Sequence, residues 1–383
     1  MLVSLIYVFK QVLSANLDLF YILSLILLIK SLIKKEKYLI KLLYVIYIIL
    51  FYTGIQIIFL NTSIDLIRYF VSSFKLILNF NLLFYIIKKI KFININKIIK
   101  NISYIFFIIL VFALILRNNN ILWRLNDYVN TFEEVRLRFF YYEPSELGFQ
   151  VAIIIIIFVF KIYTKKIINK KDFCIIIFLS IILSLTSAYG AIISLMLALI
   201  PILFKSFKLN SYKKLLIAYS IILISIVIIY LNFYKISDSY IVQRGLSIIS
   251  GEDGSVNYRF DIGLNIMINA LKNTNLLGVG LSNANTDNFI IEYSNFGLVE
   301  VIANSFMYVI TELGVLAVVF LVYLLIKCLI SAKINNSILK LSLIIYIFSY
   351  QIAGGYFSNP TNWIIYGIIL SNIKDEELFG RKD

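Results

Sequence analysis

Long runs of apolar residues, separated by short polar segments, make up most of this chain. A transmembrane helix needs about 20 mostly apolar residues, and runs near this length recur along the sequence. The pattern predicts eleven spans, over residues 17–33, 38–60, 64–87, 101–117, 149–163, 173–188, 190–204, 212–231, 299–330, 339–357 and 361–373. Residues 1–14 are a shorter amphipathic stretch, for which an interfacial helix and a twelfth, short span both remain open.

The composition agrees with a helical membrane protein. Of the 383 residues, 61% are hydrophobic and the mean hydropathy is +0.91, whereas a soluble domain is about half apolar. We therefore expect an all-α, polytopic transmembrane bundle that forms one integral membrane domain over residues 1–383, with no cleaved signal peptide. Histidine is absent, and Cys174 and Cys328 lie in apolar segments. These features predict neither a metal site nor a disulfide framework.

Lysine marks the two sides of the predicted bundle. Lysine-rich segments fall on alternate loops, at residues 34–37, 88–100, 161–172, 205–214 and 327–340. The positive-inside rule makes these loops cytoplasmic, together with the tail from Lys374. Eleven spans then put the N-terminus outside. The net charge of +15 is therefore mostly a topology signal and does not predict a nucleic-acid partner.

Arginine follows the opposite distribution. The chain has 28 Lys and 8 Arg, and the predicted outer loops are 118–148 and 232–298, the second too long for a mere connector. Seven arginines lie in outer loops or at outer span ends: Arg68, Arg117, Arg124, Arg136, Arg138, Arg244 and Arg259. The planar guanidinium binds phosphate through two parallel hydrogen bonds, so the whole set predicts a phosphorylated ligand at the outer face. Pairing with Glu133, Glu134, Asp261 or lipid headgroups accounts equally well for any single arginine.

The stretch "RLRFFYYEPSELGF" at 136–149 ends the first outer loop. Pro144 suits the first turn of a helix, and Glu146 complements the helix N-terminus. These two residues therefore predict a helix start near the end of the loop. The helix start does not explain Arg136, Arg138 or Glu143, which remain candidates for a functional site.

One further stretch lies inside the second outer loop, and another begins the span that follows it. "NYRFDIGLNIMINALKNTNLLGVGL" at 257–281 predicts an amphipathic segment that begins with Arg259 and ends in a turn. In "VEVIANSFMYVITELGVL" at 299–316, four polar residues recur every fourth position: Glu300, Asn304, Tyr308 and Glu312. On a helix they form a polar stripe, and a carboxylate within a membrane is a functional-site candidate. A helix-packing hydrogen bond or a wet face of an interfacial helix would explain the same stripe.

In their order and sidedness, these stretches resemble the superfamily of O-antigen polymerases (Wzy-type) and O-antigen ligases. The matching elements are "RLRFFYYEPSELG", "NTNLLGVGL" and "ANSFMYVITELG", and the resemblance covers about residues 136–316. "LTSAYGAIISL" at 185–195 is similar to a span start of the family, with Tyr189 where arginine is common. Ala303 stands where ligases carry histidine, so this departure favours a polymerase over a ligase.

The resemblance implies a GT-C-like, metal-independent glycosyltransferase without a cofactor. Such an enzyme transfers a growing glycan from undecaprenyl diphosphate to a lipid-linked repeat unit at the outer face of the bacterial cytoplasmic membrane, in O-antigen, capsule or exopolysaccharide synthesis. Its partners would be undecaprenyl-diphosphate-linked oligosaccharides and the lipid bilayer, with a chain-length regulator protein left open. The carried-over catalytic residues are Glu143, Glu312 and Arg259; the substrate-binding residues are Arg136, Arg138, Arg244, Asn304 and Tyr308. Asp253, Asp261 and Asp287 are held in reserve.

Three other functions lead to different expectations. A ligase shares the fold and donor but attaches the glycan to a terminal acceptor. A polysaccharide transporter or flippase predicts charges deep inside several spans and internal repeats. Only Lys10, Lys75 and Glu312 could be mid-span charges, and we find no obvious repeat. A membrane scaffold leaves the arginine distribution unexplained.

Overall fold

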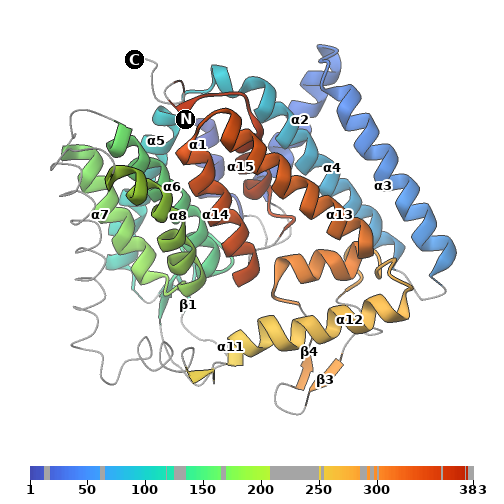
Figure 1. Cartoon of the computed structure of the whole chain (residues 1–383). Helices are drawn as coiled ribbons and strands as arrows, with labels where there is room; N and C mark the ends of the chain where they lie inside the picture. Colours follow the sequence, from blue (N-terminus) through green and yellow to red (C-terminus); the bar gives the residue numbers. More distant parts are fainter. Residues whose placement is uncertain are drawn as a thin grey trace.

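The protein is almost entirely helical in its computed structural model (Figure 1). The structure describes residues 1–12, 18–60, 65–117, 119–124, 135–164, 170–207, 250–251, 254–284, 291–293, 297–299, 302–354, 357–375 and 377. Within these residues, strands occur only as two short antiparallel pairs. The predicted all-α class is confirmed.

The elements follow one another in the order that the apolar runs predict. The helices are α1 Leu2–Val8, α2 Leu19–Ile33, α3 Leu39–Phe59, α4 Leu66–Lys89, η1 Ile90–Phe92, α5 Ile95–Ile115, α6 Pro144–Thr164, α7 Lys170–Leu185, α8 Tyr189–Phe207, α11 Gly254–Asn257, the π-helix η2 Tyr258–Ile262, α12 Gly263–Asn273, α13 Ser305–Ile334, α14 Ile338–Ala353 and α15 Pro360–Leu370. The strand pairs are β1 Trp123–Arg124 with β2 Arg136–Leu137, and β3 Ile291–Tyr293 with β4 Gly297–Val299.

Five stretches of helix in the described part of the chain are long and apolar enough to cross a membrane. They are α3, α4 together with η1, α5, α6 and α13. Shorter apolar helices accompany them: α2, most of α8, α14 and α15. The chain is therefore an α-helical membrane protein. The predicted count of eleven or twelve spans is not reached by these five. Helices α2 to α8 and α13 to α15 overlap ten of the predicted segments, and the segment predicted at 212–231 lies outside the described residues.

Helix α6 is the centre of the bundle. Protein buries 89% of its most apolar window, compared with 17% for α3, which stands at the edge (Figure 1). The run Ile153–Ile157 is buried throughout because α6 is apolar on every face, as expected for a helix surrounded by others. The exposed apolar side chains of α3 suit contact with lipid. The functional candidates at the start of α6 thus stand on the most enclosed helix of the described chain.

Contacts near several lysine-rich loops tie neighbouring helix ends together. Lys88 and Lys89 at the end of α4 both pair with Glu36, which follows α2, and hydrogen bonds from these lysines lower the pKa of Glu36. The Lys161 Nζ atom at the end of α6 lies 2.9 Å from Asp172 Oδ2 in α7. The helices thus turn back on one another at these loops. We call this end of the bundle the lysine-rich end.

Helix α1 at the N-terminus packs beside α5. The hydroxyl of Ser4 donates to the carbonyl of Ile98, within the lysine-rich segment 88–100. Helix α1 is only about 10 Å long at 1.5 Å per residue, and Val8 is fully buried against the bundle. It is therefore a short helix that packs on the bundle, and an interfacial helix and a short span both remain predictions for this stretch.

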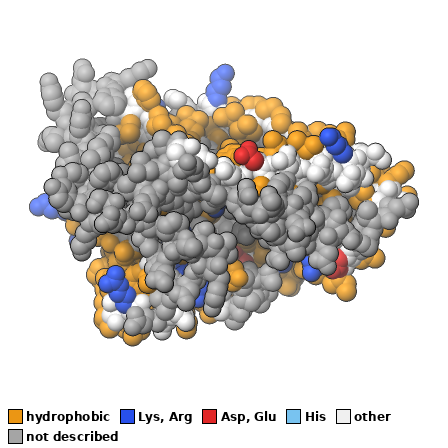
Figure 2. Space-filling model, turned by 90° about the horizontal axis from the view of Figure 1, so that it is seen from below, with side chains coloured by type: hydrophobic (Ala, Val, Ile, Leu, Met, Phe, Trp, Pro, Cys, Tyr) orange, Lys and Arg blue, Asp and Glu red, His pale blue; other side chains and the backbone are white. Residues whose placement is uncertain are grey.

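The opposite end of the molecule carries α11, α12 and the β3–β4 pair. Figure 2 shows this end from below, with a few basic and acidic side chains among hydrophobic ones. Helix α12 packs on α13. Ile262 at the end of η2 and Ile266 of α12 form a small apolar cluster with Ile302, and Met307 and Tyr308 of α13 pack against it. The predicted amphipathic segment after Arg259 is thereby confirmed as a helix lying on the bundle.

Candidate functional site

A cavity of about 420 Å³ lies where α2, α6 and α15 begin and α14 ends. This volume falls within the usual range for ligand pockets, ~300–1,000 Å³. The lining combines three kinds of side chain: the charged residues Asp18, Lys75, Glu143 and Glu146; the amides Gln11, Asn359 and Asn362; and the aromatic residues Tyr21, Tyr142, Phe149 and Tyr350. Such a mixture suits a ligand with both apolar and hydrogen-bonding surfaces.

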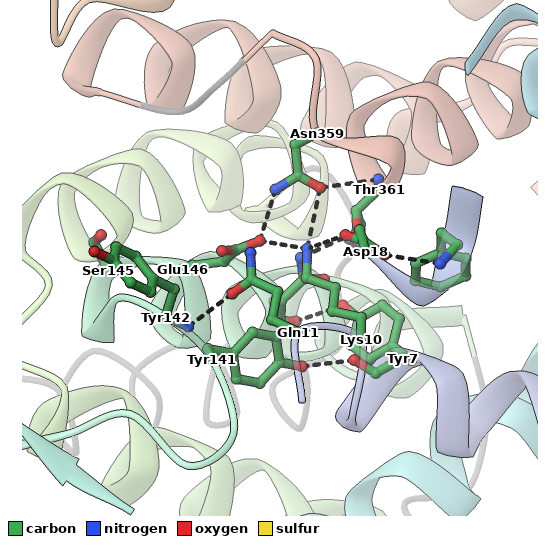
Figure 3. Close-up of polar contacts among 12 residues, drawn as sticks. Tyr7, Lys10, Gln11, Asp18, Tyr141, Tyr142, Ser145, Glu146, Asn359 and Thr361 are labelled. Carbon is green, nitrogen blue, oxygen red and sulfur yellow. Dashed lines mark hydrogen bonds and ion pairs between the residues drawn. The ribbon is translucent and has the colours of Figure 1, made fainter. Parts of the chain in front are cut away.

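Lys10 organises one wall of this cavity (Figure 3). Its side chain is fully buried, and its ammonium forms an ion pair with Glu146 and lies 3.5 Å from Asp18 Oδ2. It also donates to Asn359 Oδ1 at 3.1 Å. Two carboxylates and an amide therefore compensate one buried cation, as buried charge requires.

Asn359 and Asp18 hold this wall in place because each also caps a helix. The Asn359 side-chain oxygen accepts from the backbone N–H of Thr361 at the start of α15, and its amide donates to Glu146 Oε1 at 2.9 Å. Asp18 Oδ1 accepts from the N–H of Phe20 at the start of α2. Helix capping thus fixes the side chains that surround Lys10.

Lys75 supplies a second cation to the cavity from α4. Its Nζ atom lies 5.9 Å from the centre of the Tyr21 ring. Within the part of the chain that the structure describes, Lys75 forms no ion pair with a carboxylate. A lysine in this position within a membrane-spanning helix favours an anionic ligand in the cavity.

Glu143 is the sequence-predicted carboxylate that lines the cavity. It forms an ion pair with Arg124 of β1, and about a third of its side chain is exposed. The residue after Glu143 is Pro144, which begins α6, and Glu146 lies in the first turn. The predicted helix start is therefore confirmed. The motif at 136–149 therefore places two carboxylates, Glu143 and Glu146, on one cavity wall.

Arg259 lies behind the wall on the side of α14. A Cβ built on Gly354, which lines the cavity, would lie 3.1 Å from Arg259 Nε and 3.4 Å from the carbonyl oxygen of Ala303. Gly354 has φ +130° and closes the C-terminus of α14. Because Gly354 has no side chain, the Arg259 guanidinium can lie close to this part of the cavity lining.

Glu312, Asn304 and Tyr308 form a separate cluster with the turn "NLLGVG". Glu312 is buried and accepts from the N–H of Ser282 at 2.7 Å and from the Tyr308 side chain. Asn304 caps α13 by accepting from the N–H groups of Phe306 and Met307. These contacts hold the turn on α13, and none of the three side chains lines the described cavity.

Arg136 and Arg138 also bind protein carbonyls beside the cavity rather than within it. Arg136 Nε donates to Thr186 O at 3.1 Å and Nη2 to Ser187 O at 3.3 Å, which fastens β2 to the turn between α7 and α8. Arg138 donates to the carbonyls of Asn120 and Tyr142. Both arginines thus help to shape the hairpin that precedes α6.

Arg136→Lys is expected to destabilise the protein by about 1 kcal/mol, because an ammonium cannot reproduce the two directed bonds of the guanidinium. The measurement is unfolding in detergent with increasing SDS. Arg68→Lys is the matched control: Arg68 is 55% exposed and pairs with Asp65 in its own helix turn, so its change should stay within about 0.5 kcal/mol. Equal effects of the two changes would contradict this role for Arg136.

Several predicted residues lie outside the described part of the chain: Arg244, Asp253, Asp287 and Glu300. Asp261 is exposed in η2. Lys10, Glu146 and Asn359 were not predicted as site residues. A signal was present for Lys10, which stood out with Lys75 as a possible mid-span charge, but not for Asn359. The described residues contain no group of three or more Cys, Asp and Glu side chains placed to hold a metal.

No protein-family model matches the chain, and no curated protein matches it.

Proposed function

We propose that the protein is an oligosaccharide repeat-unit polymerase of the cytoplasmic membrane of a bacterium, with its active site at the outer face. It would transfer a growing glycan from undecaprenyl diphosphate to a lipid-linked repeat unit. The observation that carries the proposal is the cavity: it combines Lys75, which has no acidic partner in the described chain, with carboxylates and aromatic rings at the helix ends. The sequence motifs of the polymerase and ligase superfamily support the same choice.

The chemistry requires a cation for the leaving diphosphate. Negative charge grows on the diphosphate as the bond to the sugar breaks, and a cation held in place stabilises that transition state. Lys75 at the cavity and Arg259 behind Gly354 are suited to this role, and Arg244 remains a further candidate from the sequence. No metal or cofactor is required by this scheme.

The acceptor hydroxyl requires a carboxylate that aims it and takes its proton. Glu143 is the sequence-predicted carboxylate that lines the cavity, whereas Glu312 holds the turn at 276–282. We further propose that the lysine-rich end faces the cytoplasm and that the chain crosses the membrane about eleven times. On that arrangement the cavity opens toward the outer face, where the lipid-linked substrates are presented.

Arg259→Ala is expected to abolish polymer while protein abundance stays normal. The measurement is the size distribution of surface glycan from a strain that lacks the gene and carries either the wild-type gene or the variant. A single repeat unit on the lipid anchor, extended by wild type but not by Arg259→Ala, supports a polymerase. Arg68→Ala is the control, since this exposed arginine lies on α4 and does not line the cavity, and it should restore polymer.

Other outcomes of the same experiment point elsewhere. Long polymer that forms in the deletion strain but stays on the undecaprenyl carrier would indicate a ligase. Loss of all outward glycan, with repeat units retained inside the cell, would indicate a flippase. Polymer of normal length and amount from Arg259→Ala would exclude the role given to Arg259.

A further inference from the structure

We infer that Glu146 is the carboxylate that contacts the acceptor hydroxyl, in a cavity that holds the terminal sugar of the acceptor glycan. This inference rests on the proposed polymerase function and deepens it. It concerns a residue that the sequence explains as part of a helix start and that the structure places on the cavity wall.

The contacts of Glu146 leave one of its oxygens available. Lys10 Nζ and Asn359 Nδ2 both approach Oε1, as Figure 3 shows. Across the described residues, no hydrogen bond or ion pair reaches Oε2. The side chain is 14% exposed and lines the cavity. The carboxylate is therefore anchored through one oxygen, while the other can accept a hydrogen bond from a ligand.

The other candidate carboxylates are less well placed. Asp18 uses both oxygens, one on the Phe20 N–H and the other toward Lys10. Glu143 pairs with Arg124 near the rim, where 34% of its side chain is exposed. Glu312 binds the turn at Ser282 and does not line the cavity. Among these four, Glu146 combines a cavity-lining position, two anchors on one oxygen and a second oxygen that no described residue contacts.

The rest of the lining suits a sugar. A pyranose ring presents C–H faces, which pack on aromatic rings, and hydroxyl groups, which both donate and accept hydrogen bonds. Tyr21, Tyr142 and Tyr350 supply aromatic surface, and the amide of Gln11 can both donate and accept. Lys75 lies over the Tyr21 ring, so a cationic group stands within the same cavity as Glu146.

The step balances without a co-reactant. The acceptor oxygen attacks the anomeric carbon of the donor sugar, and a new C–O glycosidic bond forms. The bond from that carbon to the diphosphate oxygen breaks, and its electron pair leaves with undecaprenyl diphosphate. The proton of the acceptor hydroxyl passes to Glu146 Oε2. Lys10 and Asn359 position the carboxylate through Oε1 during this transfer.

The test uses the purified full-length chain in detergent and the lipid-linked repeat unit extracted from the deletion strain. Glu146→Gln keeps the shape of the side chain and should lower kcat for polymer formation by about 100-fold or more, which is the usual contribution of a positioned base. Glu143→Gln tests the other carboxylate on the same wall. Glu36→Gln is the matched control, since Glu36 pairs with Lys88 and Lys89 at the lysine-rich end and does not line the cavity; this variant should lose less than about 10-fold, below the contribution of a base. Glu146→Asp keeps the charge and should retain more activity than Glu146→Gln. Size-exclusion profiles must show that each variant is folded.

The outcomes separate this inference from the proposed function. If the wild-type protein forms polymer and folded Glu146→Gln forms it at the same rate, the role of Glu146 is overturned, whereas the proposed polymerase function is supported. A loss confined to Glu143→Gln would assign the role to Glu143 instead. If folded wild-type protein forms no polymer from this substrate, the proposed function fails, and the role of Glu146 fails with it. If Glu146→Gln does not fold, Glu146→Asp decides, since wild-type kcat with the shortened carboxylate would contradict direct contact.

Discussion

Lys10→Ala is expected to destabilise the folded protein by about 3–5 kcal/mol, the usual cost of removing one partner from a buried ion pair. The Lys10 side chain is fully buried and compensates the carboxylates of both Asp18 and Glu146. Without it, two negative charges remain in a cavity wall within the bundle. Unfolding of the purified protein in detergent with increasing SDS measures the loss.

The pH dependence of this variant has a defined sign. Protonation of Asp18 removes part of the uncompensated negative charge, so the deficit of Lys10→Ala relative to wild type should shrink as the pH falls below 7. A deficit that stays constant with pH would show that lost packing, rather than charge, is the cause. Lys10→Met serves as the control for packing, since it restores most of the side-chain volume but not the charge.

Lys75→Met is the matched control for position. Lys75 lines the same cavity but forms no ion pair with a described carboxylate, so its replacement should cost less than about 1 kcal/mol of stability while impairing polymer formation. We expect Lys10→Ala to lose stability and Lys75→Met to lose activity. That result would show that Lys10 stabilises the cavity wall and that Lys75 contacts the substrate. Equal instability of both variants would contradict this division.

The sequence predicted those parts of the molecule that depend on local pattern. Apolar runs located α2 to α8 and α13 to α15, because hydrophobic length is the direct requirement for crossing a bilayer. Pro144 and Glu146 located the start of α6, because helix N-termini favour these residue types. Boundaries differ most at the starts of α5 and α13. Helix α5 begins at Ile95 rather than near 101, since Asn94 caps it, and α13 begins at Ser305 rather than near 299, since Asn304 caps it.

The arrangement of the site depended on contacts that local pattern does not encode. Lys10 and Asn359 lie 349 residues apart, yet they meet on one wall. Arginine was predicted to face phosphate, but Arg136 and Arg138 bind backbone carbonyls, a partner that the same guanidinium serves equally well. Residue type therefore indicated a polar site at these helix ends. Only the fold showed that Lys75 lines the cavity, whereas Arg136 and Arg138 bind backbone carbonyls next to it.

The polar stripe Asn304, Tyr308 and Glu312 shows the same limit. Its helical spacing predicted one shared face, and the structure confirms that Tyr308 and Glu312 interact. The spacing gave no sign that the turn at 276–282 would occupy this face. The two motifs that support the family resemblance, "NLLGVG" and "ITELG", in fact pack on each other: Val279 N–H donates to Thr311 O and Gly280 N–H to Glu312 O, both at 2.9 Å.

Gly314→Ala is expected to destabilise the protein by about 3–5 kcal/mol through this same contact. Gly314 interrupts α13 with φ +57° and ψ −141°. Residues with a Cβ rarely adopt this conformation, because it costs them ~1–3 kcal/mol. A Cβ there would also lie 2.0 Å from the carbonyl oxygen of Leu276, and backbone cannot move aside as a side chain can. The measurement is the SDS unfolding midpoint, together with the yield of folded protein.

Gly54→Ala provides the matched control, because a Cβ at Gly54 in α3 meets no atom within 4 Å. This change should leave stability unchanged or raise it by up to about 1 kcal/mol, as alanine favours helix over glycine. If Gly314→Ala were as stable as Gly54→Ala, the kink in α13 would not depend on glycine. A loss specific to Gly314 would instead show that the "NLLGVG" turn and the "ITELG" kink form one rigid unit. That unit continues into the α12–α13 packing that holds Arg259 and Ala303 beside Gly354, so its loss should also lower polymer formation in the folded fraction.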